Sequence, residues 1–333
     1  MAGPDRHTIG AIHLGVIGLG VMGQRMLARL AVHPRLQATR VWDADPQAVA
    51  RTLATYPQLQ ASDSAEALIA TPGLHSLYIA TPPAPHMVLA NRGFDAGLAV
   101  LCEKPLTVDF PAARQTIARI QREGHRAAVN FSLASSPGLA ALQAAVQRPA
   151  DGVLGQPLAA RIELAFAAWP RPWQAAAGAW LAERAEGGFS REVLSHFVFV
   201  LQRVLGPATV QTSEVTYPTD GRSAETALRA WLQAGGIPIE VNAAVDGVLD
   251  DFNRLTLRGD EGEMALHDWF GAQQRRHGDE WQSLGNPADL RAQGQDAQLD
   301  QWQALIEGRP HGLPGFDEAL AVQETIERLL AGA

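Results

Sequence analysis

Cysteine is almost absent from this 333-residue chain, which contains only Cys102. One thiol excludes an intrachain disulfide, and it also excludes a zinc or iron–sulfur site built from several cysteines. The 10 histidines are scattered and show no metal-ligand spacing. We therefore expect no metal site and no adaptation to an oxidising compartment.

The chain also lacks an excess of positive charge and a long apolar run. Its formal net charge is −8, with no basic stripe, which argues against a nucleic-acid partner. The apolar run that begins at Ile9 is interrupted by glycines and is too short to span a bilayer. The first five residues lack the pattern of a signal peptide. These absences predict a cytoplasmic protein that binds neither nucleic acid nor membrane.

Apolar residues make up 47% of the chain and charged residues 19%, a balance typical of a folded protein. The length exceeds what one hydrophobic core usually serves, so we expect two domains. Residues 1–130 alternate β-rich runs with helical patterns, which predicts a parallel α/β sheet. In residues 131–333 short turns join successive strands, which predicts an α+β domain with an open, largely antiparallel sheet. The C-terminal helix could pack back on the first domain.

The predicted strands of the first domain are 11–17, 37–42, 76–80, 99–102 and 127–130, and its helices are 22–32, 46–55, 85–96 and 110–122. The predicted strands of the second domain are 158–167, 209–217, 224–234, 237–245, 253–258 and 263–266. Its predicted helices are 138–147, 190–205, 296–307 and 316–330.

A glycine-rich turn follows the first predicted strand and opens a helix. It reads G-x-G-x-x-G, and each glycine has a physical reason: Gly18 permits a tight turn, Gly20 admits a pyrophosphate, and Gly23 lets the helix approach the strand. The free amides of the helix would then point at the phosphates. The alternative is a purely structural turn. The context favours a doubly wound Rossmann domain that binds a dinucleotide through Gly18, Leu19, Gly20, Val21, Met22 and Gly23.

Asp43 ends the second predicted strand, twenty residues beyond Gly23. An acidic side chain there accepts hydrogen bonds from the ribose hydroxyls of a dinucleotide. A carboxylate at this position also repels a 2′-phosphate, so the sequence favours NAD over NADP. Arg40 and Arg51 would soften that preference.

The triplet Glu103-Lys104-Pro105 lies at the carboxyl end of the fifth predicted strand, the edge where open α/β sheets bind ligands. Pro105 keeps Lys104 extended. From that edge Lys104 could reach both a substrate and the nicotinamide ribose, and could share an alcohol proton. The alternative is an ordinary solvated Glu–Lys pair.

Together these residues resemble the Gfo/Idh/MocA oxidoreductases. The resemblance also rests on Ala80-Thr81-Pro82, His86, Trp180, Gly187-Gly188, His196 and the hairpin at 257–266. It implies an N-terminal Rossmann domain and a C-terminal sheet for substrate binding and for homodimer or homotetramer contacts. It implies hydride exchange between NAD(P) and a sugar, cyclitol or related alcohol. It also implies cofactor contacts from Thr81, Pro82, His86 and Glu103, and a catalytic and cofactor-binding role for Lys104.

The segment from Gly187 to His196 resembles the family's D-x-G-x-H helix motif, with Glu192 at the aspartate and Leu194 at the glycine. Four residues apart on a helix, Glu192 and His196 would share one face. We expect His196 to act as acid/base and Glu192 to orient it. The alternative is a histidine packed in the core. Glutamate adds one bond of about 1.5 Å, which leaves open an altered substrate geometry or a weakened enzyme.

The loop from Trp169 to Trp173 could offer stacking and a cation to a substrate through Trp169, Arg171 and Trp173. The alternative is that this loop belongs to the core or to an interface. Leu181 and Ser132 stand where many family members have arginine. Their loss of positive charge predicts a substrate that is neither phosphorylated nor strongly acidic.

The sequence thus predicts an NAD-dependent dehydrogenase or reductase that acts on a CH–OH group of a small polyhydroxylated substrate. Two alternatives stay open. One is glycoside hydrolysis by transient oxidation, in which NAD copurifies and is never consumed. The other is a catalytically silent dinucleotide sensor, which would bind cofactor without turnover.

Overall fold

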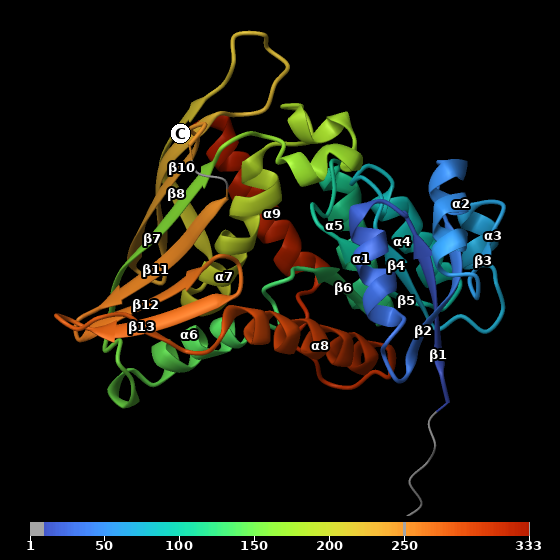
Figure 1. Cartoon of the computed structure of the whole chain (residues 1–333), viewed down its shortest axis with the longest axis horizontal. Helices are drawn as coiled ribbons and strands as arrows, with labels where there is room; N and C mark the ends of the chain where they lie inside the picture. The colour runs from blue at the N-terminus through green and yellow to red at the C-terminus, as the bar shows by residue number, and fades with distance from the viewer. Residues whose placement is uncertain (1–9, 249–250, 333) are drawn as a thin grey trace, which may run out of the picture.

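The computed structural model describes residues 10–248 and 251–332, so the first residues, where we noted no signal-peptide pattern, lie outside the described part. Figure 1 shows two sheets on opposite sides of the molecule, with helices in the space between them. No helix within these described ranges is long and apolar enough to cross a membrane.

The N-terminal sheet is wholly parallel, with the strand order β3-β2-β1-β4-β5-β6. This is the doubly wound order of dinucleotide-binding domains, so the predicted Rossmann fold is confirmed. Its strands are β1 (Ile12–Ile17), β2 (Leu36–Trp42), β3 (Gln60–Ala61), β4 (Ser76–Ile79), β5 (Ala99–Glu103) and β6 (Ala127–Asn130). Its helices are α1 (Val21–Leu30), α2 (Pro46–Thr55), α3 (Ala65–Ile69), α4 (His86–Asp95) and α5 (Phe110–Glu123). The sequence prediction missed only the short β3 and α3.

The C-terminal sheet has the order β14-β13-β12-β11-β7-β10-β9-β8. Only β7 and β10 pair in parallel and the other pairs are antiparallel, which confirms the predicted α+β character. The strands are β7 (Pro157–Phe166), β8 (Ala208–Thr216), β9 (Ala227–Ala234), β10 (Ile237–Val245), β11 (Phe252–Gly259), β12 (Gly262–His267), β13 (Gly271–Arg276) and β14 (Gln282–Ser283). The helices are α6 (Pro137–Gln147), α7 (Ser195–Leu205), α8 (Pro287–Ile306) and α9 (Phe316–Ala331).

Helix α8 begins nine residues before the predicted start at 296. Its first residue is Pro287, and the side chain of Asn286 accepts a hydrogen bond of 2.9 Å from the amide of Ala288. An Asn cap followed by proline at the first helical position is a recognised start signal. The prediction was wrong here because it followed the apolar residues and overlooked the cap.

Helix α8 packs against the N-terminal sheet although it belongs to the end of the chain, as Figure 1 shows along the lower edge of the molecule. Trp302 is fully buried in the same apolar cluster as Leu14 of β1. Its indole Nε1 donates a 3.1 Å hydrogen bond to Oγ of Ser76 in β4. The Rossmann domain is therefore covered on one face by residues that lie far away in the sequence.

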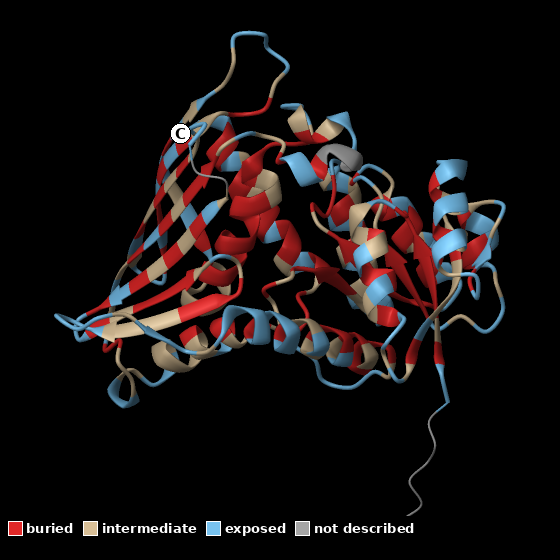
Figure 2. Cartoon of the chain, viewed as in Figure 1, coloured by how far each residue is buried: buried red, intermediate tan, exposed pale blue. Residues whose placement is uncertain are grey.

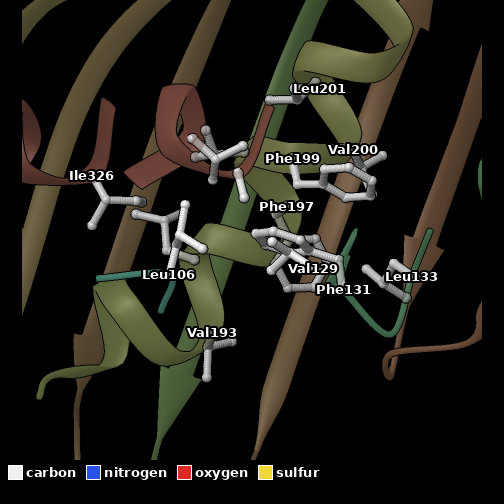
Figure 3. Packing of buried hydrophobic residues seen from close by; sticks show 14 of the residues in the cluster. Leu106, Val129, Phe131, Leu133, Val193, Phe197, Phe199, Val200, Leu201 and Ile326 are labelled. Carbon is white, nitrogen blue, oxygen red and sulfur yellow. The ribbon is translucent and has the colours of Figure 1, made fainter. Parts of the chain in front are cut away.

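A second apolar cluster runs without a break from the Rossmann sheet into the C-terminal sheet. Helix α7 lies at the centre of this cluster, with residues 195–201 buried, as the burial colours of Figure 2 show. Figure 3 shows Phe131, just after β6, against α7, where its ring stacks on Phe199 with 4.6 Å between the centroids. Leu106 lies near Ile326 of α9 in the same view. This shared packing fixes the cleft between the two sheets.

Candidate active site

A cavity of about 1050 Å³ opens at the carboxyl ends of the parallel strands. Residues that directly follow or end β1, β2, β4, β5 and β6 line one side of it. Residues from the loop after β7, from the helical turn before α7 and from α8 line the other side. This is the edge where open α/β sheets bind ligands, and both domains contribute to it.

The glycine turn has the backbone that a dinucleotide needs. Gly18 has φ +96°, and a Cβ there would lie 2.5 Å from the carbonyl of Ala80. At Gly20, the N-cap of α1, a Cβ would meet no protein atom within 4 Å. No side chain caps this helix, so its first amides are free, and Gly20, Val21 and Met22 line the cavity.

Gly23 serves the fold and does not line the cavity. A Cβ at this position would overlap the carbonyl oxygen of Gly18. Gly23 therefore lets α1 approach the turn, as the sequence predicted, but its proposed direct contact with the cofactor is not supported by its position.

Asp43 lines the same end of the cavity, and its carboxylate is anchored by the backbone. The amide of Leu19 donates to Oδ2 at 2.6 Å, and the amide of Asp45 donates to Oδ1 at 2.8 Å. Each oxygen keeps a further lone pair for a ligand hydroxyl. Arg51 is paired with Asp45 at 3.4 Å, and Arg40 is not among the residues that line the cavity.

The residues around the turn fit an NAD molecule. Thr81 and Pro82 line the cavity, and Oγ1 of Thr81 is buried without a hydrogen-bond partner. Free helix amides suit a pyrophosphate, the open space over Gly20 admits it, and the Asp43 carboxylate suits ribose hydroxyls.

His86 lies outside the cavity, so its predicted cofactor contact is wrong. It is fully buried, with Nε2 2.9 Å from the carbonyl oxygen of Thr81 and Nδ1 3.2 Å from that of Leu106. Burial lowers its pKa, which keeps the ring neutral. A neutral ring carries one N–H, so it donates to one of the two carbonyls and lies beside the other, between the loop after β4 and the turn after β5.

Glu103 is buried beneath Lys104 in a polar network. Its carboxylate accepts hydrogen bonds from the hydroxyl of Tyr78 and, at 2.6 Å, from Nδ2 of Asn130. Asn130 in turn accepts from the side chain of Gln298 on α8. Burial raises the pKa of Glu103 despite these donors. The network fixes the end of β5 and joins it to the second domain.

Lys104 reaches across the cleft to the second domain. Its Nζ donates to Oε2 of Glu192 at 2.8 Å and to the backbone carbonyl of Glu192 at 3.1 Å. Both side chains are about nine-tenths buried, with exposures of 10% and 12%. The other carboxylate oxygen of Glu192, Oε1, is buried without a partner. The pair is therefore not the solvated surface pair that was the alternative.

The expected pairing of Glu192 with His196 is wrong, because no hydrogen bond joins these side chains in the structure and Glu192 bonds to Lys104. The reason is local: Ser190–Leu194 forms a π-helical turn (η4) before α7. A π-turn bonds residue i to i+5, which changes the angular offset assumed for an α-helix. Such turns occur often at functional sites.

His196 lines the cavity, and its Nδ1 is buried with no hydrogen-bond partner. Burial, and then the positive charges of Lys104 and Arg171, lower its pKa well below the usual value. The ring is therefore neutral at pH 7. Its edge contacts Phe131 and Trp269, with ring centroids 5.5 and 5.4 Å away.

Trp269 is a cavity residue that sequence reasoning missed. Asp268 and Trp269 both have left-handed backbones, with φ 47° and 69°. The turn is held by Asn253, whose side chain accepts from the amide of Trp269 at 2.8 Å. Consecutive non-glycine residues in this region are strained, and such strain gathers at functional sites. No sequence pattern announces it.

The loop after β7 divides into an inner and a cavity-facing part. Arg171 and Trp173 line the cavity, and their contact with a substrate stays a prediction. Trp169 does not: its Nε1 donates to the carbonyl of Leu181 at 2.9 Å, and its ring packs on Phe166. Trp169 therefore follows the core alternative, and its predicted substrate contact is wrong.

Many other cavity residues were not predicted, and several polar ones come from α1 and α8. Examples are Arg25, Arg29, Arg291, Gln295 and Gln298. Arg25 and Arg29 could have been found from their four-residue spacing after the glycine turn, whereas the α8 residues carry no local signal. Among the described residues, no group of three or more His, Cys, Asp or Glu side chains could hold a metal ion.

Comparison with known proteins supports this reading of the first domain. Residues 12–131 match the GFO_IDH_MocA family model, described as an oxidoreductase family with an NAD-binding Rossmann fold. Inositol 2-dehydrogenase from Pseudomonas fluorescens is 33% identical over 153 residues, which is 44% of either chain. The chain thus matches less than half the length of this curated relative.

Solved structures extend the likeness to the whole fold. An oxidoreductase from Agrobacterium radiobacter in complex with NAD⁺, L-tartaric acid and magnesium gives a TM-score of 0.81 at 14% identity, over 96% of both chains. KijD10, a 3-ketoreductase from Actinomadura kijaniata solved with NADP and TDP-benzene, gives 0.79 at 19% identity, over 97% of this chain and 98% of that one. At such identities the likeness concerns the fold alone. The match to the GFO_IDH_MocA family model thus covers the Rossmann domain, and the solved structures show that the whole chain shares the fold of these oxidoreductases.

Proposed function

We propose that the protein is an NAD-dependent dehydrogenase or reductase that acts on a CH–OH group of a small polyhydroxylated molecule. The observation that carries this proposal is the meeting of Lys104, Glu192 and His196 in the cavity that also contains the glycine turn. The Pseudomonas relative, an inositol dehydrogenase, supports a cyclitol or sugar as the substrate class.

The side chains divide the work as follows. NAD, when bound along the turn, would accept or supply the hydride. Lys104, held by Glu192, would donate a hydrogen bond to the reacting oxygen and stabilise its negative charge. His196, which lines the cavity, would take the hydroxyl proton during oxidation and return it during reduction. The unpartnered Oε1 of Glu192 would accept from a neighbouring substrate hydroxyl.

The test is a screen of sugars, cyclitols and their keto forms, followed by nicotinamide absorbance, on wild type and Lys104→Met. Wild type should turn over at least one polyol. The variant should lose about 10²–10⁴-fold in kcat, while its affinity for NAD stays within about threefold. Cofactor binding without turnover of any substrate would favour the sensor alternative and reject the proposal. Cytoplasmic location and homo-oligomerisation through the C-terminal sheet stay predictions.

A further inference from the structure

Three arginines from distant parts of the chain gather in the cavity. Arg25 comes from α1, Arg171 from the loop after β7 and Arg291 from α8. The guanidinium carbons of Arg25 and Arg171 lie 4.5 and 4.6 Å from the centroid of the Trp173 ring, so one indole brings two cations together. The positive charges of Arg171 and Arg291 both lower the pKa of Arg25.

Two of the three arginines have no counter-ion among the residues that the structure describes. Arg171 is buried and pairs with Asp251 at 2.8 Å. Arg25 and Arg291, by contrast, form no ion pair or hydrogen bond within the described ranges, and their contacts are aromatic: Trp173 for Arg25 and, at 5.0 Å, Phe270 for Arg291.

Several other partly buried arginines have a carboxylate partner. Arg35, Arg191 and Arg203, for example, each pair with a glutamate. The chain as a whole is acidic, with a formal net charge of −8. Among the described residues, Glu103 is the acid whose charge raises the pKa of Arg25. Its carboxylate already accepts hydrogen bonds from Tyr78 and Asn130. Like charges held together without a counter-ion indicate a site that an anion would complete.

The cluster lies toward the catalytic end of the cavity. Arg171 lies 5.7 Å from the ring centroid of Trp269, whose ring meets that of His196 at 5.4 Å. The positive charge of Arg171 also lowers the pKa of His196. A pyrophosphate on the helix amides would instead lie at Gly20 to Met22, at the start of α1, whereas Arg25 lies further along the helix.

We propose that Arg25 and Arg291, supported by Arg171, form an anion subsite for the carboxylate of a polyhydroxylated acid such as a sugar acid. The inference rests on the proposed function, since it names the substrate class of the same site. Guanidinium groups bind carboxylates through paired, charge-assisted hydrogen bonds. Leu181 and Ser132 had led us to expect a substrate without strong acidity, but α1 and α8 supply the positive charge from positions that the family motifs do not include.

The test compares D-glucuronate with D-glucose, which differ by one carboxylate, on protein saturated with NAD. Dissociation constants from calorimetry and kcat/KM are measured for wild type, Arg25→Gln and Arg291→Gln. Wild type should bind the acid at least tenfold more tightly than the neutral sugar. In each variant the dissociation constant of D-glucuronate should rise about 10–100-fold. The dissociation constants of glucose and NAD should stay within about threefold of wild type. The affinity of Arg25→Lys for D-glucuronate should fall between those of wild type and Arg25→Gln. Lysine keeps the positive charge but loses the paired N–H donors of the guanidinium group.

Arg114→Gln is the matched control, because Arg114 is exposed, pairs with Glu324 and lies outside the cavity. It should change none of the affinities. Equal binding of acid and neutral sugar to wild type overturns the proposal. Loss of NAD affinity in Arg25→Gln also overturns it and assigns the arginines to the cofactor. Inorganic phosphate, titrated without turnover, separates the two claims: arginine-dependent phosphate binding in an inactive protein supports the subsite and rejects the reaction, whereas no anion binding rejects the subsite.

Discussion

Lys104 and Glu192 form the link that closes the candidate site: Nζ of one lies 2.8 Å from Oε2 of the other, across the two domains. Lys104 directly follows β5 of the Rossmann domain, and Glu192 lies in the π-helical turn before α7. The glutamate that stands at the aspartate of the D-x-G-x-H motif therefore contacts Lys104. It holds the lysine at the cavity, where the sequence alone suggested a weakened acid/base pair.

Replacement of Glu192 should slow the reaction without loss of cofactor. In Glu192→Gln the amide oxygen can still accept from Lys104, so we expect a fall of about tenfold in kcat. In Glu192→Leu the side chain of Lys104 loses its partner and can move by about 1 Å or more. We therefore expect kcat of this variant to fall by about 10²-fold or more. NAD affinity should stay within about threefold in both. Steady-state kinetics and NAD titration measure the two effects, and unchanged kcat in Glu192→Leu would show that the ion pair has no role in turnover.

His196 should make stability depend on pH. Its folded pKa is lowered by burial and by nearby cations, and that of His86 by burial. The two histidines of the unfolded chain bind protons near pH 6.5, whereas those of the folded chain do not. The free energy of unfolding is therefore highest above about pH 7, and it falls as the pH drops below about 6.5. The loss is up to about 1.4 kcal/mol per pH unit for each histidine. Urea unfolding of wild type and His196→Gln between about pH 7.5 and 5 measures it, and the variant should show the shallower slope. Identical slopes would contradict a buried neutral His196.

Gly20 and Gly23 should separate cofactor binding from folding. A methyl group at Gly20 meets no protein atom within 4 Å and faces the cavity, so Gly20→Ala should keep the melting temperature of wild type and weaken NAD binding at least tenfold. At Gly23 the methyl overlaps the carbonyl oxygen of Gly18, so Gly23→Ala should lower the melting temperature as well. Thermal denaturation and NAD titration provide the comparison. Full NAD affinity in Gly20→Ala would place the dinucleotide elsewhere.

Asp43 should govern the choice between NAD and NADP. Asp43→Asn removes the charge that repels a 2′-phosphate, so we expect the ratio of kcat/KM for NAD over NADP to fall by about tenfold or more. The same change leaves the amides of Leu19 and Asp45 with one acceptor fewer, so the melting temperature must be measured alongside. A wild type that already prefers NADP would overturn this assignment.

The sequence by itself determined the Rossmann domain, the dinucleotide turn and the position of Lys104. These are local matters: three glycines, a strand before them and a helix after them are sufficient to set a backbone that exposes amides. The placement of His86 and Trp169 was missed for the opposite reason. A histidine or tryptophan beside a site looks the same in sequence whether its ring faces the cavity or the core.

Only the tertiary structure decided which distant side chains line the cavity together. Arg25, Arg291 and Trp269 meet there from α1, α8 and the turn after β12, and no spacing along the chain relates them. The partner of Glu192 was likewise set by one π-helical turn and by the packing that brings the two domains together. Neighbouring residues determine the local backbone conformation. The gathering of charged side chains in a cleft depends instead on packing between elements that are far apart in the sequence.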